Sequence, residues 1–205
     1  MLSRMSLSRK ILLSVGALGA AASIAGLGTF ATFTSTTSAS QTVTSGTVTI
    51  ALGSTGASTN RLTVNASNIV PGDTMQRSFD LTNSGSDDLA SITLTTSATA
   101  SSALDTDATN GLQMTIDKCS IAWVELGTSP AFTYTCAGTT STVLASRAVI
   151  GSNISLSNLG ATTQGATDHM RLTLTLPSGA TNTLQGLTST VSYAFTGTQR
   201  AATNK

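Results

Sequence analysis

The sequence predicts an all-β fold, a jelly-roll-like antiparallel β-sandwich, preceded by an N-terminal signal peptide and an extended arm. Apolar and polar residues alternate with a period of two through most of the chain after Thr47, which is typical of strands with one buried face. Thr and Val are frequent, and 18 Gly stand against 3 Pro, a composition that favours strands joined by glycine turns. The chain opens with basic residues and then an apolar segment, the order found in export signals.

The first 31 residues have the organisation of a signal peptide. Three basic residues (Arg4, Arg9 and Lys10) precede an apolar segment over 11–28, and small residues then place a cleavage site between Ala31 and Thr32. We therefore expect a signal peptidase to cut the chain and the product to lie outside the cell or on its surface. Two alternatives stay open: cleavage after Ala39, or retention of the segment as a membrane anchor, since about 18–21 apolar residues just span a bilayer.

Residues 32–46 form the predicted arm, a candidate donor strand. They are mostly Ser and Thr, with Phe33 and Val43 as isolated large apolar side chains and no helical period. Alone the arm has little to bury, but its β-branched residues suit it to become a strand where a sheet edge is offered. Residues 47–205 are then one β-sandwich domain, because about 174 residues after cleavage suffice for a single core.

About nine short runs after Thr47 have the strand pattern, and each has one apolar face, so a second sheet must cover the first. Pro71-Gly72 suits the two central positions of a type II turn. Segments 142–150 and 158–168 lack the pattern and are candidates for a short helix, and 97–110 is expected to be a surface loop. The apolar positions of the clearest runs are Val48, Ile50 and Leu52; Leu62, Val64 and Ala66; Met75, Phe79 and Leu81; Met170, Leu172, Leu174 and Leu176; and Val191, Tyr193 and Phe195.

Charge and cysteine content narrow the functional classes. Three of the 10 Lys and Arg lie before the cut, which leaves seven against 9 Asp and Glu. With this slight negative excess and no basic patch, nucleic acid is not an expected partner. Cys119 and Cys136 are the only cysteines, and an even count behind an export signal predicts one disulfide.

The sequence offers no catalytic, metal-ligating or cofactor-binding set. His169 is the only histidine, and its place at the start of a predicted strand favours a solvent-facing or hydrogen-bonded role. Asp105 and Asp107, with Asn110 and Gly111 behind them, suggest a calcium loop but do not fit the EF-hand register. Trp123, the only tryptophan, is expected in the core, and the alternative is a platform that stacks on a sugar.

Several short motifs in order resemble the start of the TasA/camelysin family of secreted proteins. Gly28-Thr29-Phe30-Ala31-Thr32-Phe33 is followed by Ser45-Gly46-Thr47-Val48, then by Ile69-Val70-Pro71-Gly72-Asp73 and Phe79-Asp80-Leu81-Thr82-Asn83-Ser84-Gly85. The likeness covers about residues 10–95, and Pro71, Gly72 and Asp73 form its turn motif. The segment from Cys119 to Cys136 departs from the pattern.

The resemblance implies a jelly-roll subunit of extracellular biofilm-matrix fibres, in which the arm of one subunit adds a strand to the next. Partners would be further copies of the chain or related fibre subunits, and the protein would not be an enzyme. A monomeric surface binding or adhesion module, using Trp123, is the alternative. A metallopeptidase, as the camelysin branch has been described, is a third hypothesis, for which one histidine and no His-Glu-x-x-His motif are a poor donor set.

Overall fold

The computed structural model describes residues 47–63 and 69–202. The predicted cleavage site at Ala31 and Thr32, and the arm residues Phe33 and Val43, lie outside the described residues. The described part is nearly all strand, with every pairing antiparallel, so the predicted fold class is confirmed.

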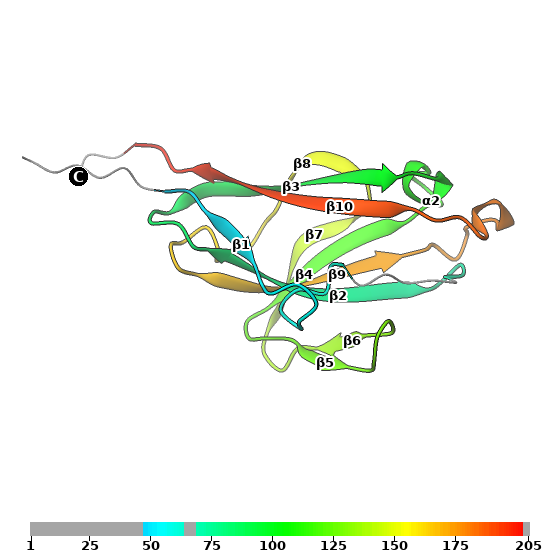
Figure 1. Cartoon of the computed structure of the whole chain (residues 1–205), viewed down its shortest axis with the longest axis horizontal. Coiled ribbons are helices and arrows are strands. Elements are labelled where there is room, and N and C mark those ends of the chain that lie inside the picture. The colour runs from blue at the N-terminus through cyan, green and yellow to red at the C-terminus, as the bar shows by residue number, and fades with distance from the viewer. Residues whose placement is uncertain (1–46, 64–68, 203–205) are drawn as a thin grey trace, which may run out of the picture. The chain divides into compact units, whose positions relative to one another are not determined.

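Two sheets form the sandwich, and a hairpin lies outside it (Figure 1). Consecutive strands mostly cross from one sheet to the other, so that neighbours such as β2 and β9 are distant in sequence, as in a jelly roll. The five-stranded sheet has the order β1 (Ile50–Leu52), β2 (Thr74–Asn83), β9 (Thr167–Thr175), β4 (Gln113–Cys119) and β7 (Thr140–Ala148). The three-stranded sheet has the order β10 (Thr190–Gln199), β3 (Leu89–Ala100) and β8 (Gly151–Ser155), and the hairpin pairs β5 (Val124–Leu126) with β6 (Thr133–Thr135).

The core lies between the two sheets and follows the period of two. Alternate residues of β2, β3, β4 and β9 point inward, and Leu81, Leu94, Met114 and Met170 are each 0% exposed. Full burial of one such side chain contributes roughly 1.5–3 kcal/mol relative to exposure. The alternation that predicts the strands therefore also identifies most of the core.

Two sequence predictions about local structure were wrong. Segment 142–150 is not helical but forms most of β7, where Val143 and Leu144 are both buried beside a register shift that breaks the alternation. Segment 97–110 is not only loop: β3 continues to Ala100, and helix α2 (Ala103–Thr106) follows. Ser102 caps this helix, and Asp105 completes the capping box, a pairing that supplies partners for amide groups at the helix start.

Two further segments differ from their predicted form. Residues 158–166 contain turns rather than a helix, and β9 begins directly after them. Leu62 and Thr63, where a strand is predicted to start, lie in a turn, and the remainder of that predicted run lies outside the described residues. A single 3-10 turn, η1 (Asn182–Leu184), precedes β10.

Leu94→Ala should lower the free energy of unfolding by about 2–5 kcal/mol, because it leaves a cavity at a fully buried position. Thr93→Ala, on the opposite face of the same strand, is the matched control and should cost less than about 1 kcal/mol. Urea denaturation of the two variants measures both values. Equal losses would mean that the inward face of β3 is assigned incorrectly.

Candidate functional site

One side of the sandwich, between β2 and β10, is not closed by any described strand. β10 pairs with β3 along one edge only, from Thr190 to Gln199. β1 covers the outer edge of β2 only at Leu81–Asn83. Backbone hydrogen bonds from Gly53 and Arg61 to the carbonyls of Asp80 and Ser78 occupy the middle of that edge. Among the described strands, none pairs with the remaining edge of β2 from Thr74 to Gln76.

Between these two edges lies a cleft of about 670 Å³. Its lining comes from both sheets and from the loops that join them, and it is rich in large apolar side chains. Val70 at 57% and Leu187 at 38% are among the most exposed large apolar residues of the described chain. Other lining residues are Leu62, Ile69, Met75, Leu176, Val191 and Tyr193.

The inner face of β10 is less well covered than that of neighbouring β3 along its whole length. Val191, Tyr193 and Phe195 point toward the core but are only partly buried, whereas Ile92 and Leu94 on neighbouring β3 are 1% and 0% exposed. The far end of β10 is closed. There Ile50 of β1 packs over Gly197, where a Cβ atom would lie 2.7 Å from the Ile50 Cδ1 atom. Among the described residues, strand β1 covers the Gly197 end of β10, and no strand covers the Val191 end.

The predicted type II turn forms the rim of the cleft. Asp73 N–H donates to the Val70 carbonyl (2.9 Å), and Gly72 has a φ of +97°, which favours glycine. The Asp73 carboxylate accepts the Val70 N–H at 2.8 Å. Two backbone hydrogen bonds hold the turn against Leu176, the residue that follows β9. Gly72 N–H donates to the Leu176 carbonyl, and Leu176 N–H donates to the Asp73 carbonyl. The turn motif Pro71, Gly72 and Asp73 thus fixes one wall of the cleft.

Tyr193 lines this cleft, and Arg77 lies close enough to it to affect its pKa. Burial raises the pKa of the Tyr193 phenol well above its usual value, and the nearby Arg77 opposes that shift without cancelling it. Burial likewise lowers the pKa of the Arg77 guanidinium, whose side chain is 1% exposed and donates to the Gln76 carbonyl. The inner part of the cleft is therefore poorly solvated.

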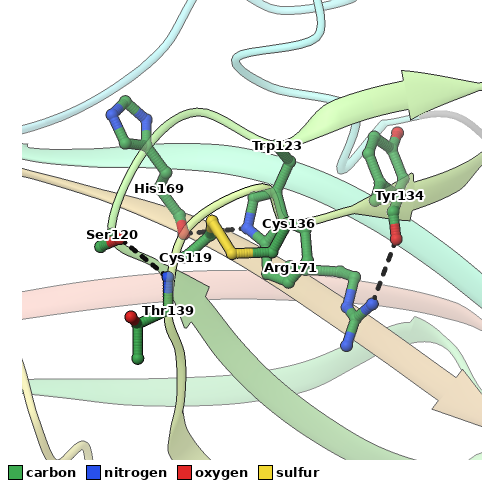
Figure 2. The surroundings of a disulfide bond; sticks show 8 residues. All are labelled: Cys119, Ser120, Trp123, Tyr134, Cys136, Thr139, His169 and Arg171. Atoms are coloured by element: carbon green, nitrogen blue, oxygen red, sulfur yellow. Dashed lines mark hydrogen bonds between the residues drawn. A yellow bond between two sulfur atoms is a disulfide. The ribbon is translucent and has the colours of Figure 1, made fainter.

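A second feature is the β5–β6 hairpin, which packs on the outer face of the five-stranded sheet (Figures 1 and 2). Cys119 and Cys136 form a disulfide at its base, the pairing that the sequence predicts. Trp123 is 9% exposed, its Nε1–H donates to the His169 carbonyl at 2.9 Å, and the Arg171 guanidinium lies 4.4 Å from its ring centre. Trp123 is therefore held beneath the hairpin and presents no ring on which a sugar could stack.

The acidic residues singled out for calcium serve the local fold. Burial acts to raise the pKa of the Asp105 carboxyl, but hydrogen bonds from Ser189, Ser102 and Ser101 outweigh it and hold the pKa below its usual value. Asp107 accepts hydrogen bonds from the backbone N–H groups of Thr109 and Asn110. Both carboxylates are thus engaged by protein donors.

The family model described as camelysin metallo-endopeptidase matches residues 6–204. The chain belongs to the camelysin family. No curated protein matches the chain. Within the described residues of this camelysin family member, no helix is long and apolar enough to cross a membrane.

A catalytic zinc ion, as the family description implies, usually needs three protein ligands. Every His, Cys, Asp and Glu of the chain lies among the described residues, and no group of three or more of them is placed to hold a metal ion. The His169 Nδ1 atom lies 2.7 Å from Asp80 Oδ1 on the outer sheet face, and both cysteines are in the disulfide. These residues do not fit such a zinc site.

Above about pH 10, the Tyr193 phenol should destabilise the fold. The pKa of the phenol is higher in the folded than in the unfolded chain. Its contribution to the free energy of unfolding is therefore fully present below pH 10 and is lost as the pH rises toward the pKa of the folded state. Tyr193→Phe should therefore flatten the decline of unfolding free energy between pH 10 and 12, by up to about 1.4 kcal/mol per pH unit. Urea denaturation across this range measures the slopes. If the free energy of unfolding fell equally steeply with pH in both proteins, the Tyr193 phenol would be solvent-exposed in the folded state.

Proposed function

We propose that the mature protein is a secreted, non-enzymatic structural protein, a subunit of extracellular biofilm-matrix fibres that assemble by N-terminal strand donation. Its partners are further copies of itself or related fibre subunits. The observation that carries the proposal is the cleft between β2 and β10, where two strand edges flank an apolar, incompletely covered interior.

Such a cleft is suited to one kind of occupant, an extended peptide. Strand edges carry unpaired N–H and C=O groups that an added strand can satisfy. Because alternate residues of a strand share a face, one side of the added segment would cover Val191 and Tyr193 while the other faced solvent. A rigid small molecule would leave the backbone edges unpaired.

The predicted arm has the properties of that segment. Residues 32–46 contain no Asp, Glu, Lys or Arg, so burying them removes no charge from water. Phe33 and Val43 are ten residues apart, an even spacing that places both side chains on the same face of an extended strand. The arm can therefore offer apolar groups at two points along a cleft.

The attachment point of the arm supports donation to a second copy. The arm joins the described chain at Thr47, which exchanges hydrogen bonds with Ser86 beside the closed end of β10, while the cleft is at the other end. Figure 1 shows β1 starting at the end of the sandwich opposite the start of β10. A contact that joins one end of a subunit to the opposite end of the next does not close on itself and makes a filament.

Electron microscopy of the mature protein, beginning at Thr32, tests this function. We expect filaments from this protein and none from a copy that lacks residues 32–45. Val191→Lys should also abolish filaments, because it places a charge in the cleft. Ser192→Lys, the adjacent exposed position on the outer face of β10, is the matched control and should assemble normally.

The outcomes separate the alternatives. Filaments from the protein without its arm would contradict strand donation. Monomers from every version would indicate an arm that fills the cleft of its own chain, or a surface binding module. Circular dichroism of the Val191→Lys and Ser192→Lys variants establishes that both retain the fold.

A further inference from the structure

Met75 differs from the other methionines of the mature chain in its exposure. The sequence has five methionines, of which Met1 and Met5 belong to the predicted signal peptide. Among the described residues, Met114 and Met170 are each 0% exposed, whereas Met75 is only partly buried. Both cysteines are in the disulfide. Met75 is therefore the only side chain of the mature sequence that carries a reduced sulfur and is also in contact with solvent.

The position of Met75 in the fold explains its exposure. On the inner face of β2, Phe79 and Leu81 are 1% and 0% exposed, and Met75 lies where that buried row ends. Met75 lines the cleft, and it is the middle residue of the segment Thr74–Gln76, whose outer edge pairs with no described strand. A strand added to this edge would cover Met75 and separate it from water.

Oxidation changes the chemistry of this wall of the cleft. A thioether is apolar and flexible, and it adapts to the surface that it contacts. With hydrogen peroxide, a lone pair of the sulfur attacks one peroxide oxygen and the O–O bond breaks. The other oxygen leaves as water after taking up the proton of the transferred oxygen. The sulfur loses two electrons, the peroxide gains them, and the side chain becomes a polar sulfoxide.

A sulfoxide at this position is poorly compatible with an added strand. If its oxygen points into the cleft, the added strand removes that oxygen from water, and burial of a polar group without a hydrogen-bond partner costs free energy. If the oxygen points to solvent, the side chain leaves the apolar wall to which Leu176 and Val191 also contribute. In both cases the strand binds less tightly to the oxidised than to the reduced protein.

We propose that Met75 is an oxidation site that controls strand acceptance by the cleft: the thioether permits the added strand, and the sulfoxide formed by peroxide weakens its binding. The inference rests on the proposed fibre function. Because Met114 and Met170 are fully buried, the fold directs the oxidant to Met75. The change is reversible, since methionine sulfoxide reductases restore the thioether.

The first measurement locates the oxidation. The protein without residues 32–45, whose cleft is free of its own arm, is treated briefly with hydrogen peroxide and analysed by mass spectrometry of its peptides. The sulfoxide should form at Met75 about tenfold faster than at Met114 or Met170, because access of peroxide to the sulfur limits the rate.

The second measurement follows assembly of the mature protein, beginning at Thr32, with each protein compared with its own untreated sample. Peroxide should raise the protein concentration at which filaments form by about tenfold, equivalent to about 1.4 kcal/mol. Reductases for both sulfoxide epimers should reverse the change. Met75→Leu, which has a similar volume and no sulfur, should not respond to peroxide. Met114→Leu, the matched control at a buried position, should respond as the unsubstituted protein does.

The results separate this inference from the fibre function. Equal oxidation rates at the three methionines, an equal response of Met75→Leu, or unchanged assembly of protein oxidised at Met75 would overturn the inference and leave the fibre function intact. If Met75→Leu itself assembles poorly, reversal by the reductases decides instead: recovery of assembly supports the inference, and no recovery overturns it.

If the untreated protein forms no filaments, the fibre function fails, and a binding measurement decides the inference. Fluorescence anisotropy then follows a labelled peptide of residues 32–45 added to the protein that lacks them. Binding that oxidation of Met75 weakens would support the inference. Binding that oxidation leaves unchanged, or no binding at all, would overturn it.

Discussion

A β-sandwich has to cover the inner face of each strand, and in this chain the strand order leaves one strand without full cover. β10 joins the second sheet as its edge strand, while the short β1 covers only the last part of β2. The side of the sandwich between them is closed at Gly197 by Ile50 and is open around Val191 and Tyr193. Within the described residues, apolar surface and strand edges without a pairing strand therefore occur together at one place, and an added strand would satisfy both.

The family description implies a metal-dependent peptidase, whereas the residues of this chain do not fit a catalytic zinc site. Camelysin is described as a metallo-endopeptidase, yet His169, the single histidine, is paired with Asp80 on the outer face of a sheet. The other polar groups first considered as sites have structural partners: Asp105 caps a short helix, and Trp123 anchors the hairpin. The cleft and the outer face of the hairpin, by contrast, expose large apolar side chains.

The sequence predicted most of the fold because period-two alternation is a local property. The alternation of Met170, Leu172 and Leu174 identified β9 and its buried face together. It failed at Val143 and Leu144, where a register shift buries two adjacent residues and hides the strand. Short capping patterns such as Ser102 with Asp105 were also missed, because the Ser- and Thr-rich context masks them.

The cleft and the hairpin face were not predictable, because each depends on contacts between distant parts of the chain. Val191 and Tyr193 have the same alternation as fully buried positions, and only the strand order shows that no described strand covers them. Likewise, Val124 and Leu126 belong to an apolar run that includes Trp123. Trp123 is buried because it packs against Arg171, and Glu125 faces inward because it pairs with Arg61. These contacts between distant parts of the chain decide which residues of the run are exposed.

Hydrogen exchange of β10 tests the central claim most directly. The outer-edge amides of Thr190–Gln199 should exchange quickly in the monomer and become protected in assembled protein, because an added strand would supply their missing partners. Mass spectrometry of peptides from this strand, with and without residues 32–45 in the protein, measures the change. Protection that appears only with the arm present is the predicted result. Assembled protein in which β10 exchanges as fast as in the monomer would contradict the claim that the cleft receives a strand.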